Sequence, residues 1–213
     1  MTQPPPHRPA FRDPNRQGRA AQILIGLYAL LDAVHAAVTL AEGPGHGMLL
    51  LANLNLPVLI ALGAGVVTFL VWFQTSRCNA ETLRPGTSAY TTDAAVWSWF
   101  APPLLLWRPR RIALDVARAF RADGASDRTV LLVNLWWAAW LARLASWFGV
   151  TAESRYATVP VVLTESLDLV AAVLVILVVQ RLTDAQNALL RPPVPPVSSA
   201  PAASESAGLA AEA

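Results

Sequence analysis

Four long apolar runs constrain this chain more than any other feature. They lie at about 20–41, 54–75, 129–149 and 160–180. A helix needs about 20 apolar residues to cross the ~30 Å hydrocarbon core of a bilayer, and each run reaches that length. Four such helices buried in a water-soluble fold would leave a chain of 213 residues with too little polar surface to enclose them. We therefore expect an all-α, polytopic membrane helix bundle with four transmembrane helices.

The scarcity of charge agrees with this expectation and excludes several functional classes. Only 14% of the residues are charged, against roughly a quarter in soluble domains. The formal net charge of +2 produces no broad positive field, so we predict no nucleic-acid partner. A single Cys and three His offer no disulfide framework and no metal-ligand spacing. Because the sequence also lacks the common catalytic motifs, we expect no enzymatic activity, no cofactor and no metal.

A fifth apolar stretch at 94–107 is too short to be an ordinary span. It has fourteen residues, and Pro102 and Pro103 interrupt it. Arginines near span ends stay on the cytoplasmic side of a membrane. If the stretch does not cross, fourteen Arg lie inside and one outside; if it crosses, seven lie inside and eight outside. We therefore predict a re-entrant or interfacial half-membrane segment, in an inner (plasma) membrane protein with both termini in the cytoplasm.

The two ends of the chain differ in composition from the membrane domain predicted at 19–190. Residues 1–18 are rich in Pro and Arg, and residues 191–213 are rich in Pro, Ala and Ser. Neither segment has an apolar periodicity that could build a core. We expect both to be disordered cytoplasmic tails.

A helix is predicted at 109–122, directly after the half-membrane segment. Its apolar residues Ile112, Val116 and Phe120 lie four apart and form one stripe. An amphipathic helix of this kind can lie on the inner leaflet and present guanidinium groups to anionic lipid headgroups. The alternative, a helix packed against the underside of the bundle, is equally favoured. The arginines assigned to lipid contact are Arg110, Arg111, Arg118 and Arg121.

Ionisable groups occur within three of the four apolar runs. At ~1.5 Å per residue, Asp32, Arg143 and Asp168 fall at similar depth on three helices. A lone charge there costs about 2.5–3.5 kcal/mol, so we predict that Arg143 pairs with Asp32 or Asp168. The predicted intramembrane cluster is completed by His35 and Glu165. A static ion pair that fixes packing is the favoured interpretation, and a proton or ion relay is the alternative.

Several local motifs resemble those of one protein family. They are FLVWF at 69–73, RCNA at 77–80, WFAP at 99–102, LWRP at 106–109 and WWAAWL at 136–141. In this order and spacing they resemble a bacterial family of multi-span membrane proteins catalogued as domain of unknown function 4328, over about residues 60–185. The resemblance implies an integral membrane protein and brings no established activity. The loop motif that we single out consists of Trp99, Pro102, Trp107, Arg108 and Pro109.

Two hypotheses for the function follow. The first is a non-enzymatic scaffold or regulatory membrane protein whose cytoplasmic loop docks membrane lipids or a partner. The second is a small transporter or channel subunit that uses the intramembrane cluster. Small residues four apart, such as Ala61 with Gly65 and Ala138 with Ala142, allow close helix packing. That packing serves either the bundle itself or contact with a membrane-protein partner or a second copy.

Overall fold

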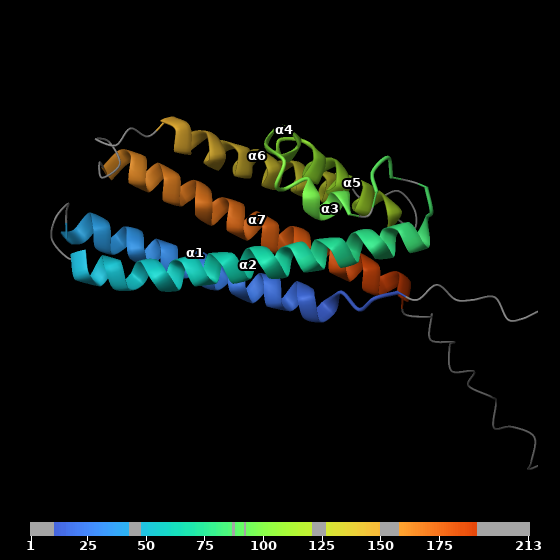
Figure 1. The fold of residues 1–213 in the computed structure, drawn as a ribbon, viewed down its shortest axis with the longest axis horizontal. Helices are drawn as coiled ribbons and strands as arrows, with labels where there is room; N and C mark the ends of the chain where they lie inside the picture. Colours follow the sequence, from blue (N-terminus) through green and yellow to red (C-terminus); the bar gives the residue numbers. More distant parts are fainter. Residues whose placement is uncertain are drawn as a thin grey trace, which may run out of the picture.

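In the computed structural model, all regular structure within the described residues is helical. The described ranges are 11–42, 48–86, 88–91, 93–120, 127–149 and 158–190. The elements, shown in Figure 1, are α1 (Asn15–Glu42), α2 (Met48–Leu83), α3 (Ala94–Trp97), α4 (Pro102–Leu105), α5 (Arg108–Ala119), α6 (Asp127–Gly149) and α7 (Thr158–Leu190).

The helices α1, α2, α6 and α7 confirm the predicted fold class. Each is long and apolar enough to cross a membrane. Three of them extend well beyond the apolar runs of the sequence; α2, for example, has 36 residues. Apolar runs mark only the part of a helix that suits hydrocarbon, whereas backbone hydrogen bonding continues into the polar residues on either side.

The long helices run along one axis, and the short ones lie together in one half of the bundle (Figure 1). Helix α1 packs against both α2 and α7, and α7 packs against α6. Helix α5 contacts α2 and α6. We call the end where α1 begins and α7 finishes the terminal end, and the other the opposite end.

Small residues set the close approach of α1 to α2. Gly65 is buried, and a Cβ atom there would lie 3.5 Å from the side chain of Ile25. Ala61 on the same face of α2 is also buried. The predicted pair Ala61 and Gly65 thus serves packing inside the bundle. Ala138 and Ala142 of α6 are exposed instead.

The outer faces of the long helices are apolar. Large side chains such as Ile23, Ile60 and Val159 are more than 60% exposed. Exposed Leu, Ile and Val continue along all four helices. A soluble protein rarely exposes so large a continuous apolar surface, whereas a bundle surrounded by acyl chains requires it.

The N-terminal tail is ordered earlier than predicted. Residues 11–14 have no regular secondary structure, α1 begins at Asn15, and Pro14 is fully buried. The carboxylate of Asp13 accepts a hydrogen bond from the backbone N–H of Asn15 at 2.9 Å, which lowers the pKa of Asp13. The expectation of disorder was therefore wrong for residues 11–18. The remainder of that tail and the tail at 191–213 lie outside the described residues.

Candidate functional site

Three carboxyl groups meet between α1 and α7. Asp32 comes from α1, while Glu165 and Asp168 lie one turn apart on α7. One oxygen atom from each of these side chains lies within 4.8 Å of the others. Arg143 of α6 forms an ion pair with Asp168. The Tyr28 hydroxyl donates a hydrogen bond to the Asp32 carboxylate at 3.2 Å.

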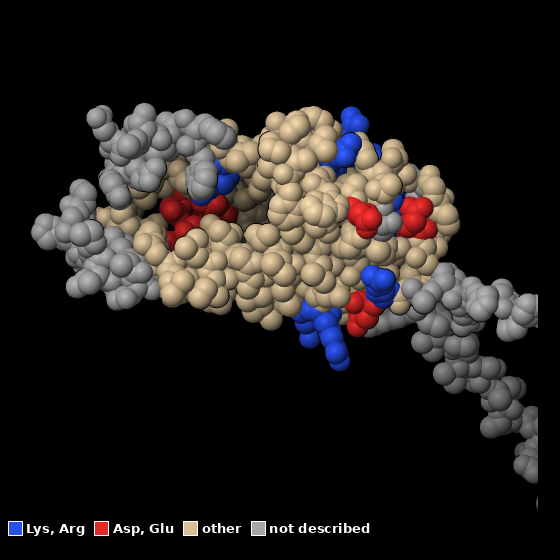
Figure 2. Space-filling model, viewed as in Figure 1, with Lys and Arg blue, Asp and Glu red and all other residues tan. Residues whose placement is uncertain are grey.

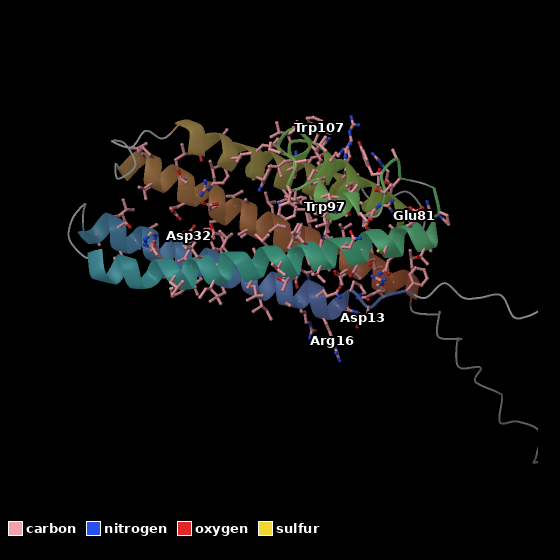
Figure 3. All side chains as sticks on the ribbon, viewed as in Figure 1. Asp13, Arg16, Asp32, Glu81, Trp97 and Trp107 are labelled. Atoms are coloured by element: carbon pink, nitrogen blue, oxygen red, sulfur yellow. The ribbon has the colours of Figure 1, made fainter. Side chains whose placement is uncertain are left out.

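This acidic cluster lines a crevice of about 260 Å³ formed by residues 29–40 of α1 and 162–169 of α7. Figure 2 shows the acidic atoms in a hollow of the surface, and Figure 3 labels Asp32 on α1. The three carboxyl groups are partly exposed. Within the described residues, one guanidinium group forms an ion pair with an acid of this cluster of three carboxyl groups. The cluster there carries excess negative charge unless it takes up protons or a cation.

The structure brings together four of the five residues of the predicted intramembrane cluster. Asp32, Arg143, Glu165 and Asp168 do come together. His35 belongs neither to the group of close ligand atoms nor to the crevice wall. Three residues separate His35 from Asp32, as they do Glu165 from Asp168 on α7. Spacing and depth alone therefore did not decide which side chains reach the cluster.

Away from the acidic cluster, in the half of the bundle toward the terminal end, Trp99 lies at the centre of an aromatic cluster. Its ring is 5.7 Å from that of Phe69 and 5.9 Å from that of Trp140, edge-on to both. Rings of α2 and α6 surround it, so the residue joins α3 to two long helices. The five rings around Trp99 belong to Phe69, Phe73, Trp136, Trp137 and Trp140.

Trp99 has different surroundings from Trp97 and Phe100, its neighbours in the apolar stretch 94–107. Trp97 and Phe100 are 70% and 64% exposed, but Trp99 faces inward. The chain turns after α3 instead of continuing as one helix. Hydropathy alone could not make the distinction, because an indole ring suits lipid and an aromatic core equally well.

The rest of the loop motif forms two helix starts. Pro102 begins α4, and Pro109 lies in the first turn of α5, where its missing N–H costs nothing. Between them, the indole N–H of Trp137 donates to the carbonyl of Leu106 at 3.1 Å. Trp107 is exposed next to this anchored turn (Figure 3).

Helix α5 buries its apolar stripe in protein. Ile112 and Val116 are fully buried and Phe120 nearly so, in a helix that contacts α2 and α6. This arrangement matches the packed alternative rather than a stripe inserted into lipid. The helix also ends at Ala119, before the predicted end at 122.

The four arginines assigned to lipid contact have different surroundings. Arg110 donates to the side chain of Asn134 on α6, whereas Arg118 pairs with Asp115 in its own helix. Arg111 is exposed and donates to the hydroxyl of Tyr90. Arg121 lies outside the described residues.

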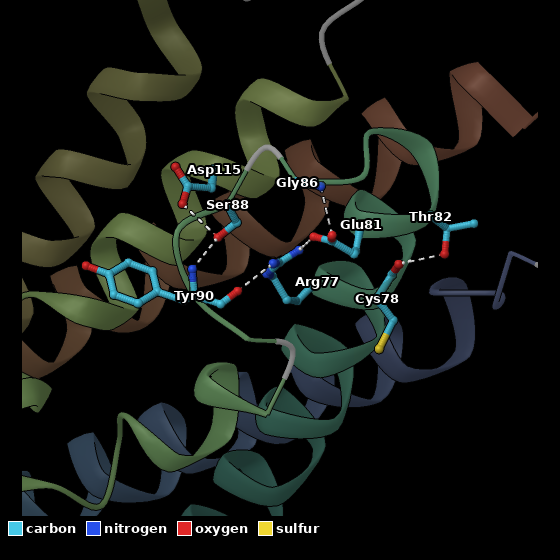
Figure 4. Close-up of polar contacts among 8 residues, drawn as sticks. All are labelled: Arg77, Cys78, Glu81, Thr82, Gly86, Ser88, Tyr90 and Asp115. Carbon is cyan, nitrogen blue, oxygen red and sulfur yellow. Dashed lines mark hydrogen bonds and ion pairs between the residues drawn. The ribbon is translucent and has the colours of Figure 1, made fainter.

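Polar contacts attach the segment before α3 to the bundle (Figure 4). Arg77 of α2 is 2% exposed and donates both to Glu81 and to the carbonyl of Tyr90, each at 2.9 Å. Ser88 donates to Asp115 of α5 at 3.1 Å. Hydrogen bonds thus hold the segment between α2 and α3 to α2 and to α5.

A buried amide network at the terminal end was not anticipated. The Asn79 side chain accepts from the backbone N–H of Arg12 and donates to its carbonyl. It also donates to Gln186 of α7, which in turn donates to Ser76. Asn79 and Gln186 each follow an apolar run, which could have marked them as helix-end contacts. Their pairing requires knowledge of which helices are neighbours.

Comparison with known proteins identifies the chain's family. The family model described as Domain of unknown function (DUF4328) matches residues 48–184. The chain belongs to this family. The DUF4328 region covers the aromatic cluster, the loop, Arg143 and both acids of α7, while α1 with Asp32 precedes it. No curated protein and no solved structure shows a significant match.

Proposed function

We propose that this DUF4328 protein is a non-enzymatic membrane scaffold whose loop, α3 to α5, is seated in the inner leaflet and docks lipid there. One observation carries the proposal. The loop is fixed from inside by the ring of Trp99, while Trp97, Phe100 and Trp107 remain exposed on its outside. Rigidly held aromatic groups with neighbouring arginines are the usual anchors at a membrane interface.

The proposal places the terminal end in the cytoplasm and the segment 94–107 inside the membrane. Trp99 contacts Phe69, which lies six residues before Thr75, the end of the predicted second span. At ~1.5 Å per residue this corresponds to about 9 Å below the inner surface of the hydrocarbon core. That depth suits a half-membrane segment and falls well short of a crossing.

Spin-label accessibility tests this placement. In a Cys78→Ser background, single nitroxide-labelled cysteines replace Trp97, Phe100 or Arg118, and the protein is reconstituted in liposomes. We expect labels at 97 and 100 to collide with oxygen, which partitions into lipid, and the label at 118 to collide with a water-soluble nickel chelate. Ile60, exposed near the middle of α2, supplies the lipid-facing reference. Equal collision of all three loop labels with the nickel chelate would place the loop in water and refute the proposal.

A second candidate function is transport or conduction of protons or small cations through the acidic cluster. It is favoured by the convergence of three carboxyl groups on one crevice with excess negative charge. Carboxylate oxygens are the ligands that hard cations prefer, and intramembrane acids are common in proton relays.

Flux measurements separate this candidate from a static role. In liposomes with an entrapped pH indicator and an imposed membrane potential, a relay predicts proton entry that Asp32→Asn and Glu165→Gln abolish. Ser166→Ala, which changes the crevice wall without removing an acid, is the control. Absence of flux in the unmodified protein, with sodium and potassium also tested, would leave the cluster a structural ion pair.

A further inference from the structure

Two guanidinium groups meet at the side chain of Tyr90. The Cζ atom of Arg108 lies 5.2 Å from the centroid of the Tyr90 ring. Arg111 donates to the hydroxyl of the same residue at 3.4 Å. The start of α5 therefore presents two positive charges around one phenol group.

These two charges lack an acidic partner within the described part of the chain. Neither Arg108 nor Arg111 has a carboxylate oxygen within 4.0 Å there, whereas Arg77 and Arg118 pair with acids. The positive end of the α5 helix dipole adds to them, and no side chain caps that end. An anion would relieve the mutual repulsion of these groups.

The position of Tyr90 along the bundle indicates the depth at which the guanidinium groups of Arg108 and Arg111 lie. Its carbonyl accepts a hydrogen bond from Arg77, two residues beyond Thr75 at the end of the predicted second span. The exposed side chains of Leu106 and Trp107 directly precede Arg108. Positive charge and apolar surface thus adjoin at the level where headgroups meet acyl chains.

We propose that Arg108, Arg111 and Tyr90 bind the phosphate of an anionic phospholipid, with Leu106 and Trp107 against the first part of its acyl chains. Guanidinium groups donate several directed hydrogen bonds to phosphate oxygens, and the tyrosine hydroxyl can contribute another. The apolar neighbours favour a lipid over a free anion. This site rests on the proposed position of the loop in the inner leaflet, and it identifies the lipid that the loop binds there.

The chain supplies a matched control for the test. Arg110 and Arg118 lie on the same helix and carry the same charge, but their side chains are engaged by Asn134 and Asp115. Replacing them lowers the net charge as much as replacing Arg108 and Arg111. A difference between the two double variants therefore measures a site and not total charge.

The experiment uses the purified full chain in a mild detergent and native mass spectrometry to count retained lipid. Phosphatidylglycerol, phosphatidylcholine and inorganic phosphate are added separately. We expect preferential retention of phosphatidylglycerol by the unmodified protein. The amount of phosphatidylglycerol retained should fall about tenfold in Arg108→Gln/Arg111→Gln and change within about twofold in Arg110→Gln/Arg118→Gln. Arg111→Gln alone and Tyr90→Phe are measured too, so that poor folding of the double variant does not leave the question open.

The outcomes discriminate between explanations. Equal losses in both double variants would indicate diffuse electrostatic attraction and overturn the site. No preference for phosphatidylglycerol, or displacement of it by millimolar inorganic phosphate, would overturn the lipid assignment. Each of these results is compatible with a loop seated in the leaflet, because spin-label accessibility tests that seat independently.

Discussion

Gly18 illustrates how one missing side chain makes room for another. A Cβ atom at this position of α1 would lie 3.1 Å from Thr183 Oγ1 and 3.3 Å from Trp72. The buried indole of Trp72 donates to that same hydroxyl at 3.0 Å, linking α2 to α7. Gly18 thus lies directly over the hydrogen bond that joins the other two helices.

We expect Gly18→Ala to destabilise the protein. Overpacking of this kind costs about 1–3 kcal/mol, which exceeds the 0.5–1 kcal/mol that alanine contributes to a helix. Thermal unfolding in detergent, followed by tryptophan fluorescence, measures the change. Gly63→Ala is the control, because a Cβ atom there meets nothing within 4 Å, and it should be neutral or slightly stabilising. Equal effects of the two substitutions would contradict this account.

The ion pair between Arg143 and Asp168 gives a second prediction at this scale. Arg143→Gln leaves partly buried acids without their guanidinium partner and should cost about 3–5 kcal/mol. Adding Asp168→Asn removes one of those charges and should restore part of the loss. A double-mutant cycle on the unfolding free energies measures the coupling. Additive effects of the two changes would show that the pair contributes nothing specific.

Sequence reasoning reached some residues of the candidate site and not others. Asp32, Arg143 and Asp168 could be grouped because depth in a span follows from residue count. The contact of Tyr28 with Asp32 could have been predicted from their spacing of four residues on one helix. The exclusion of His35 depends on the rotation of α1 about its axis. A helix whose outer surface is apolar nearly all round carries little amphipathic signal from which that rotation could be predicted.

At the scale of elements, the loop was predicted in outline. Pro109 begins the helix predicted at 109–122 and lies in the first turn of α5, whereas Pro102, predicted to interrupt the stretch 94–107, begins α4. The packing partners of the loop were not predictable, because α5 presents an apolar stripe that fits lipid as well as a protein groove. Burial of Ile112 and Val116 shows the groove to be the partner.

Trp99→Ala should detach α3 from the long helices. The substitution removes a ring that contacts five others and should cost about 3–5 kcal/mol. Hydrogen exchange of the segment 94–107 should rise accordingly. The matched variant Trp97→Ala removes an exposed ring and should leave exchange nearly unchanged. Unaltered exchange in Trp99→Ala would show that the hydrogen bond from Trp137 to Leu106 suffices to hold the loop.

For the whole molecule, the number of long apolar helices followed directly from the sequence, whereas their neighbours did not. Hydropathy counts spans but contains no information on which helices touch. The contacts of α1 with both α2 and α7 emerge only in three dimensions. The same limitation hid the link between Asn79 and Gln186.

The orientation of the protein in the membrane is a prediction about the whole molecule. Reporter fusions after Gly47, Arg84, Arg121 and Arg155 should report outside, inside, inside and outside, because most arginines then lie in the cytoplasm. Paired alkaline phosphatase and green fluorescent protein fusions give opposite signals at each site. An outside signal after Arg121 would mean that the stretch 94–107 crosses the membrane.

The amide network at the terminal end has a consequence for biosynthesis. Arg12 bonds to Asn79, and Asn15 exchanges side-chain hydrogen bonds with Asn187, 172 residues later in the chain. Arg12 can pair with Asn79 once α2 is synthesised, but Asn15 must wait for the end of α7 before its pair with Asn187 can form. Insertion of the early helices can proceed in order along the chain, but closure of this end must follow the synthesis of α7. Until then, the side chain of Asn15 lacks its partner on α7, and the start of α1 is not yet joined to the last helix of the bundle.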